Sequence, residues 1–283
     1  MCGRMKSFFR SKAPFRDPSG DKGWLNRITQ APPHDTTKLT ICPPGWEKRR
    51  QPLKLAVLAD LHTGSHADDV SRFRKIVDQI NLWSPDVVLV LGDFMNTQFL
   101  GGGRVPPETS AQVISKLKTR LGIYAILGNH DWHYDGEAVR HALATRDITV
   151  LENDCRRVAD KAGEFFIAGL ADEQTRHPEV DATLSRIPND VPVLIMAHDP
   201  ATFANIPKGP YLTLCGHTHG GQIRLPVVGP IFNSSSAPLR WTEGYIIEED
   251  RHLFVSRGLG TSIIPVRFNC PPEVCLMTVG GEP

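Results

Sequence analysis

The chain has 283 residues, enough for one large α/β domain, and a net charge of +1. With 40% hydrophobic and 22% charged residues, its composition excludes a wholly disordered chain. The sequence contains no apolar run of the roughly 18 residues that a membrane-spanning helix needs, and residues 1–10 lack the apolar segment of a secretory signal peptide. We therefore expect a cytoplasmic protein.

Residues 1–50 differ from residues 51–283 in charge and pattern. They contain eleven Lys or Arg and four Asp or Glu, a balance of +7 that leaves −6 for the rest of the chain. The pattern predicts a basic, largely irregular extension, with a candidate lone edge strand at Lys38–Cys42, ahead of one domain over residues 51–283. Basic residues interleaved with aromatic ones favour peripheral contact with an anionic membrane, and a solvated tail is the alternative interpretation.

The first half of the domain predicts alternating strands and helices. Strands are predicted at Leu55–Ala59, Asp86–Leu91 and Ile123–Leu127, and helices at Val70–Ile80, Ser110–Leu117 and Glu137–Thr145. Each of the three strands ends in polar residues. This order predicts a largely parallel sheet whose ligand site lies along the C-terminal edge of the strands.

The second half predicts a second sheet of shorter strands. These strands are predicted at Phe165–Ala168, Val191–Met196, Tyr211–Leu214, Tyr245–Ile247 and Leu253–Val255. Two of them also end in polar residues, at His198 and at the Gly216-His217-Thr218-His219 motif. The residues alone thus predict an α/β fold with two sheets.

Polar clusters at five strand ends supply seven candidate metal ligands. They are Asp60, His62, Asp93, Asn129, His198, His217 and His219. Carboxylate and amide oxygens mixed with imidazole nitrogens suit Mn, Fe or Zn. Taken singly, Asp60 is also typical of a helix cap, and Asp93 of a Gly-Asp turn. His198 alone is more typical of a core histidine, but its strand end, expected between the strands of Asp60 and His217, favours a ligand.

The spacing of the ligands strengthens the metal interpretation. Asp60 and His62 lie two residues apart, so on an extended segment both side chains would face one ion. His217 and His219 repeat this spacing between glycines, which let the backbone approach a metal and its substrate. Gly128 permits a sharp turn from an apolar strand into three consecutive polar residues.

In this order the motifs Asp-x-His, Gly-Asp, Gly-Asn-His-Asp, His and Gly-His-x-His resemble the calcineurin-like metallophosphoesterase superfamily, over about residues 53–279. Three further segments resemble its bacterial phosphodiesterase branch, similar to YkuE and YaeI: His198–Pro200, Gly216–Ile223 and Ser256–Ser262. The resemblance implies a four-layer α/β/β/α metallophosphoesterase sandwich. It also implies a metal-dependent phosphoric ester hydrolase, a phosphodiesterase or pyrophosphatase acting on a small or lipid-linked substrate.

The resemblance further implies a role for each motif residue. Asp60, His62 and His219 would hold one divalent transition-metal ion, Asn129, His198 and His217 a second, and Asp93 would bridge the two. A metal-bound hydroxide would then attack phosphorus. His130 would stay free of metal and act at the leaving group as general acid or stabiliser, with Asp131 orienting its ring.

Departures from related motifs narrow the expected activity. The segment Phe94-Met95-Asn96 lacks the arginine of Ser/Thr protein phosphatases, and Asp131 replaces their glutamate, which disfavours that activity. Arg257 is a candidate phosphate clamp, with a surface ion pair as the alternative. A nuclease on the same scaffold is disfavoured by the acidic balance of residues 51–283, and a non-catalytic scaffold by the complete ligand set. We expect a phosphoester substrate, no nucleic acid and no obligate protein partner.

Overall fold

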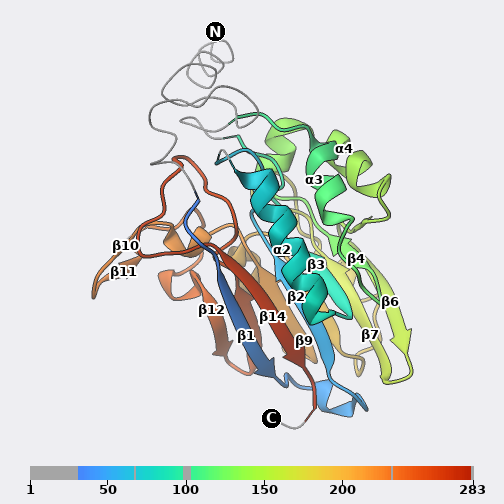
Figure 1. The fold of residues 1–283 in the computed structure, drawn as a ribbon. Helices are drawn as coiled ribbons and strands as arrows, with labels where there is room; N and C mark the ends of the chain where they lie inside the picture. The colour runs from blue at the N-terminus through green and yellow to red at the C-terminus, as the bar shows by residue number, and fades with distance from the viewer. Residues whose placement is uncertain (1–30, 67, 98–102, 231, 282–283) are drawn as a thin grey trace.

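The computed structural model describes residues 31–281 apart from 67, 98–102 and 231 (Figure 1). Two six-stranded sheets form its centre. In spatial order, the first contains β1 (Asp35–Ile41), β14 (Glu273–Val279), β2 (Leu53–Leu58), β3 (Val87–Val90), β4 (Ile123–Ala125) and β5 (Thr149–Val150). The second contains β12 (Gly244–Glu248), β13 (Arg251–Val255), β9 (Tyr211–Cys215), β8 (Val193–Met196), β7 (Gly163–Gly169) and β6 (Asp154–Asp160).

Helices and short turns cover these sheets. The α-helices are α2 (Asp69–Trp83), α3 (Pro107–Ile114), α4 (Asn129–Ala144) and α5 (Val180–Leu184). The 3-10 turns are η1 (Trp46–Lys48), η2 (Pro200–Asn205), η3 (His219–Gly221) and η4 (Leu239–Trp241), and a small antiparallel pair consists of β10 (Arg224–Leu225) and β11 (Gly229–Pro230). Among the described residues, we find no helix with the length and apolar character that crossing a bilayer requires.

Both sheets have a parallel centre. Strands β2, β3, β4 and β5 run parallel, and so do β13, β9, β8 and β7, whereas β14, β12 and β6 pair antiparallel with β2, β13 and β7. This confirms the predicted parallel sheet and the predicted second sheet. The expected place of His198 between the strands of Asp60 and His217 is wrong, because β8 lies in the second sheet between β7 and β9 while β2 lies in the first.

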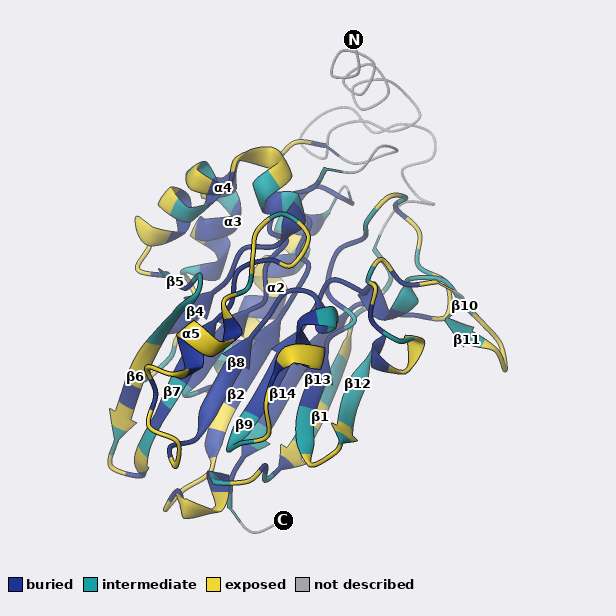
Figure 2. Cartoon of the chain, turned by 180° about the vertical axis from the view of Figure 1, so that it is seen from behind, coloured by how far each residue is buried: buried dark blue, intermediate teal, exposed yellow. Residues whose placement is uncertain are grey.

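Successive side chains along a strand enter different hydrophobic cores, and these cores separate the layers of the fold. Leu55 and Val57 on β2 face the space between the sheets, where they join the core that includes Phe165 and Met196 of the second sheet. The intervening Ala56 belongs to a different core, with residues of α2, α3 and α4. Successive side chains on a strand point to opposite faces, so one apolar strand serves two cores. Figure 2 shows the buried strands inside and exposed residues on the outer segments.

A third core covers the outer face of the second sheet. Val193 and Ile195 of β8 pack there with Phe203 of η2 and Trp241 of η4. This outer layer is thin, because its α-helix α5 has only five residues and the remainder is 3-10 turn and loop. The four-layer α/β/β/α sandwich is confirmed.

Helix α4 begins at Asn129, well before the start predicted at Glu137. The Asp131 carboxylate accepts a hydrogen bond from the backbone N–H of Gly128 at 3.0 Å, which stabilises the first turn of the helix. Asp135 interrupts the helix with an extended φ of −177°. The early start places Asn129 in the first turn of a helix, directly after β4.

Strand β1 pairs in parallel with β14 from Asp35, opposite Glu273, to Ile41, opposite Val279. The edge strand expected at Lys38–Cys42 therefore starts earlier and is hydrogen-bonded rather than lone. Its partner lies at the far end of the chain, and a local pattern does not reveal such a pairing. Residues 1–30 lie outside the described residues, and the division of the chain at residue 50 stays a prediction.

Candidate metal centre

The ends of five parallel strands bring the predicted ligands together between the two sheets. Asp60 and His62 follow β2, Asp93 follows β3, Asn129 follows β4, His198 follows β8, and His217 and His219 follow β9. All seven are at most 6% exposed. Ligand atoms of Asp60, His62 and His219 lie within 4.8 Å of one another, and the same holds for Asp93, His198 and His217. Among the described residues the structure thus contains two adjacent groups of potential metal ligands, and a third group, His62, Asp93 and His130, overlaps both of them.

Left-handed backbone conformations turn most of these side chains inward. The φ angles lie between 40° and 68° at Asp60, His62, Asp93, His217 and His219. Such conformations are uncommon for residues other than glycine and cluster at functional sites, where the surrounding structure compensates for their strain. The extended segment expected at Asp60 and His62 is therefore wrong, and tight turns orient this pair instead.

Asp93 lies between the two groups. Its Oδ2 is 3.4 Å from His62 Nε2 in one group and 3.2 Å from His198 Nε2 in the other. Its Oδ1 accepts a hydrogen bond from the backbone N–H of His130 at 2.9 Å, which holds the carboxylate in place. One carboxylate oxygen therefore faces both groups at once.

Asp60 and Asn129 offer oxygen atoms to the same space. The backbone N–H of His217 donates to Asp60 Oδ1 at 2.9 Å, so this carboxylate also joins the first sheet to the second. Asn129 Oδ1 is buried and has no hydrogen-bond partner among the described residues. A buried oxygen without a partner is costly, and a cation would satisfy it. The donor set therefore fits divalent metal.

Backbone carbonyls orient two of the histidines. His62 Nδ1 lies 3.1 Å from the Met95 carbonyl oxygen, and His198 Nδ1 lies 2.7 Å from the Leu91 carbonyl oxygen. A carbonyl oxygen only accepts, so each Nδ1 carries a proton, and Nε2 is the ring nitrogen available to a metal ion. Nε2 is the atom that faces Asp93 in both cases, and this arrangement is typical of metal-binding histidines.

Burial sets the protonation of the site. Burial raises the pKa of Asp60 to about 7 and lowers the pKa of His62 to about 3, and it also lowers the pKa of His219 well below its usual value. In His198, burial by itself lowers the pKa, but the Asp93 carboxylate outweighs it and holds this pKa well above its usual value. His62 and His219 are therefore in the neutral form that binds metal.

Sequence reasoning missed three residues that hold the histidines. His217 Nε2 lies 3.1 Å from the Ser234 carbonyl oxygen and 2.8 Å from Gln174 Nε2. The Arg267 guanidinium lies 3.3 Å from His219 Nδ1. All three come from loops without a motif, so nothing local in the sequence signalled them.

His130 stands at the edge of the site. Its ring packs edge-on against His62, with centroids 4.6 Å apart. Its Nε2 lies 3.2 Å from the Ser262 hydroxyl, and its Nδ1 bonds the Thr97 hydroxyl. The two hydroxyls hold the ring next to both ligand groups.

Asp131 does not hold the His130 ring, contrary to the expectation. Its carboxylate accepts hydrogen bonds from the backbone N–H groups of Gly128 and Met95, each at 3.0 Å. These bonds tie the start of α4 to the loop after β3. Helix α4 begins at Asn129, and the Asp131 carboxylate caps its start. Asp131 therefore holds backbone groups of the site in place.

Arg257 does not face the site as a phosphate clamp would. Its guanidinium lies 3.1 Å from Asp35, 3.4 Å from Glu273 and 3.9 Å from Glu243. Three carboxylates around one guanidinium leave no excess positive charge for a substrate anion. The ion-pair alternative describes this residue.

We expect Gly128→Ala to weaken metal binding. A Cβ at this position would lie 2.3 Å from Asp93 Oδ1 and 2.6 Å from His198 Nε2, so both side chains would have to move. Loss of a group that supports a metal ligand typically costs about 10- to 100-fold in metal affinity, and displacement of two candidate ligands should cost at least as much. Metal content and affinity of the purified variant test this.

Gly244→Ala is the control, because its Cβ meets nothing within 4 Å although φ is +85°. It should lose about 1 kcal/mol of stability and keep its metal. Normal metal affinity in Gly128→Ala would contradict the expectation.

Known proteins with similar sequences agree with the fold and the site. The sequence profile of the calcineurin-like phosphoesterase family matches residues 53–221. The chain is 31% identical to phosphodiesterase YaeI of Escherichia coli (strain K12), over 83% of this chain and 89% of that protein. It is 29% identical to the uncharacterized metallophosphoesterase YkuE of Bacillus subtilis (strain 168), over 86% of this chain and 83% of that protein.

The fold, the clustered ligands and these relatives define a metal-dependent phosphoric ester hydrolase. The chain belongs to the calcineurin-like phosphoesterase family, and its similarity to YkuE and YaeI extends over most of its length.

Proposed function

We propose that the chain hydrolyses phosphodiesters or pyrophosphate-linked esters, on a small or lipid-linked substrate, with two divalent transition-metal ions. The observation that carries this proposal is the position of Asp93 Oδ2, close to His62 Nε2 on one side and His198 Nε2 on the other. Asp60, His62 and His219 would hold one ion and Asn129, His198 and His217 the other, with Asp93 bridging. The mixed nitrogen and oxygen donors match Mn, Fe or Zn.

When bound, two such ions supply a water of lowered pKa and positive charge that stabilises the phosphoryl oxygens. The residues of the chain orient the ligand groups and the histidine rings. Asp93 sets the separation of the two ligand groups, and the carbonyls of Met95 and Leu91 fix the histidine rings. His130, whose ring packs edge-on against His62, would donate an N–H to the leaving oxygen as general acid or stabiliser.

A substrate screen tests the proposal. Metal-loaded protein is expected to hydrolyse an aryl phosphodiester, to stop when a chelator removes the metal, and to recover when Mn or Zn is returned. The screen includes monoesters, pyrophosphate-linked lipids and nucleic acids. Full turnover by protein that elemental analysis shows to be metal-free would contradict the two-metal proposal. Preferred cleavage of nucleic acid would favour the nuclease alternative.

We also propose that residues 1–50 attach the protein to anionic membranes. Their +7 balance contrasts with −6 over residues 51–283, so this segment is the part of the chain with the charge for such contact. Each basic residue near an anionic surface contributes about 1 kcal/mol. We expect co-sedimentation with anionic vesicles at low salt, but not with neutral vesicles. Deletion of residues 1–30, which leaves β1 complete, should abolish it. Equal sedimentation of the truncated chain would show that this segment is only a tail.

A further inference from the structure

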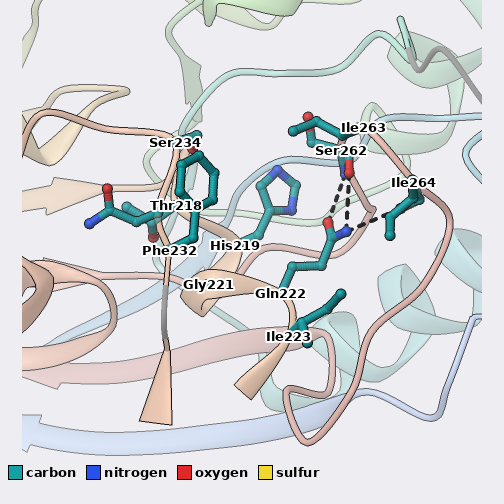
Figure 3. A pocket seen from close by; sticks show the side chains of 11 residues that line it. Thr218, His219, Gly221, Gln222, Ile223, Phe232, Ser234, Ser262, Ile263 and Ile264 are labelled. Atoms are coloured by element: carbon teal, nitrogen blue, oxygen red, sulfur yellow. Dashed lines mark hydrogen bonds between the residues drawn. The ribbon is translucent and has the colours of Figure 1, made fainter. Parts of the chain in front are cut away.

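A cavity of about 240 Å³ lies beside the metal centre (Figure 3). Its wall includes the candidate ligand His219. It also includes Ser262, whose hydroxyl lies 3.2 Å from His130 Nε2. The cavity therefore adjoins both a ligand of the centre and the residue expected at the leaving group. A phosphoric ester bound at the centre would have one of its arms next to this cavity.

The wall of the cavity is mainly apolar. Ile223, Phe232, Ile263 and Ile264 contribute to it, and the lining residues include no Asp, Glu, Lys or Arg. Figure 3 shows Phe232 on one side of His219 and Ile264 on the other. Ile223 comes from a different segment than Ile263 and Ile264, and a bridge between Ile223 and Phe268 joins these two segments. Such a lining gives few partners to a polar substrate group.

Gln222 is a polar residue of this wall, and its amide is used within the wall. Its Nε2 donates to the backbone carbonyls of Ser262 and Ile264, each at 3.1 Å. Its Oε1 accepts from the backbone N–H of Ser262 at 2.9 Å (Figure 3). These three bonds fix the segment that carries Ile263 and Ile264. Gln222 thus shapes the cavity and directs its donors into the protein.

The rim of the cavity exposes large apolar side chains. Phe232 is 62% exposed and Ile263 is 59% exposed. Ile263 also has a left-handed φ of 66°, which a β-branched residue rarely adopts, and such strain is typical of ligand-binding segments. Neighbouring apolar residues gathered on a surface mark interaction sites. An apolar ligand that extends out of the cavity would cover both side chains.

We propose that this cavity binds an alkyl chain carried by the phosphoric ester substrate, an inference that rests on the proposed hydrolase function. An alkyl chain loses no hydrogen bonds when it leaves water, and it gains about 0.8 kcal/mol for each buried methylene. A nucleoside or sugar in the same place would bury its donors and acceptors against Phe232, Ile263 and Ile264, which costs free energy for each group left unpaired. The substrate class is therefore a phosphodiester with one alkyl or acyl arm.

A series of p-nitrophenyl alkyl phosphates, from methyl to octyl, tests the proposal with a constant leaving group. For the natural chain, kcat/KM should rise about fourfold with each added methylene until the cavity is full. The octyl ester should also be hydrolysed with a higher kcat/KM than p-nitrophenyl thymidine phosphate. Phe232→Ser and Ile263→Ser should flatten this dependence. Leu82→Ser is the matched control, because Leu82 is 88% exposed on α2 and is not part of the cavity wall. It should keep the full dependence.

Binding measured without turnover separates this proposal from the proposed function. In calorimetry on metal-loaded protein, octyl phosphate below its micelle concentration should bind at least tenfold more tightly than methyl phosphate. Its binding should show a negative heat-capacity change, which marks burial of apolar surface. Chain-length-dependent binding without hydrolysis of any ester would refute the hydrolase function and keep the cavity assignment. If hydrolysis required metal but neither hydrolysis nor binding depended on chain length, the cavity assignment alone would be overturned. Normal binding of octyl phosphate by Phe232→Ser would overturn it as well.

Discussion

Replacement of Asp93 by alanine is expected to remove metal and activity together. Asp93 Oδ2 lies 3.4 Å from His62 Nε2 and 3.2 Å from His198 Nε2, so its loss affects both ligand groups. Metal ions stabilise developing charge in the transition state by several kcal/mol, and each 1.36 kcal/mol is a factor of ten in rate. We expect kcat/KM for a phosphodiester to fall by about 10³-fold or more. Elemental analysis of the purified variant measures the metal directly.

Two further variants make this result specific. His217→Ala should also lose metal and activity, because His217 contributes to the second group. Asp78→Ala removes an exposed carboxylate on α2 and should behave as the natural chain. A full complement of metal in Asp93→Ala, together with normal turnover, would refute a bridging role for this carboxylate.

His130→Ala is expected to keep its metal and lose most of its turnover. The ring lies next to the ligand groups, edge-on to His62 and held by the Ser262 hydroxyl. General acid assistance typically contributes about 10² to 10⁴-fold. The loss should be near the upper value with an alkoxide leaving group, which needs a proton, and much smaller with p-nitrophenolate. Rates for both ester types, with metal content measured in parallel, check this difference.

The same helix offers a matched control for His130. His133 is exposed, and its ring centroid lies 6.3 Å from that of His130. We expect His133→Ala to retain metal and to hydrolyse both ester types at nearly the natural rate. If His130→Ala lost the same factor on both leaving groups, proton donation would be the wrong role, and if it lost metal, His130 would be a ligand.

Strand ends were accessible from the sequence because their signals are local. The apolar run before Asp60 and the run before Asp93 each predict a buried strand, and β2 and β3 form there. A polar residue after such a run marks the C-terminal end of a strand, where parallel sheets place ligands. The two-residue spacing of His217 and His219 is also local. Candidate ligands and fold class followed from these patterns and from the family resemblance that they carry.

Residue roles that depend on distant contacts were not accessible in this way. Asp131 is adjacent to His130 in the chain, yet its carboxylate binds the backbone of Gly128 and Met95. Arg257 looked available for a phosphate, but Asp35 and Glu273 approach it from the two ends of the chain. Neither contact has a sequence signal, because each partner is defined by the packing of separate segments.

The sequence by itself determined the strand–helix order, the polar strand ends and the chemical types of the candidate ligands, since these depend on hydrophobic periodicity over a few residues. Only the tertiary structure decided that β8 lies between β7 and β9, that β1 pairs with β14, and that an apolar cavity adjoins His219. These features arise where segments distant in the chain pack side by side. Their free energy comes from burial and hydrogen bonds between those segments, which no local pattern encodes.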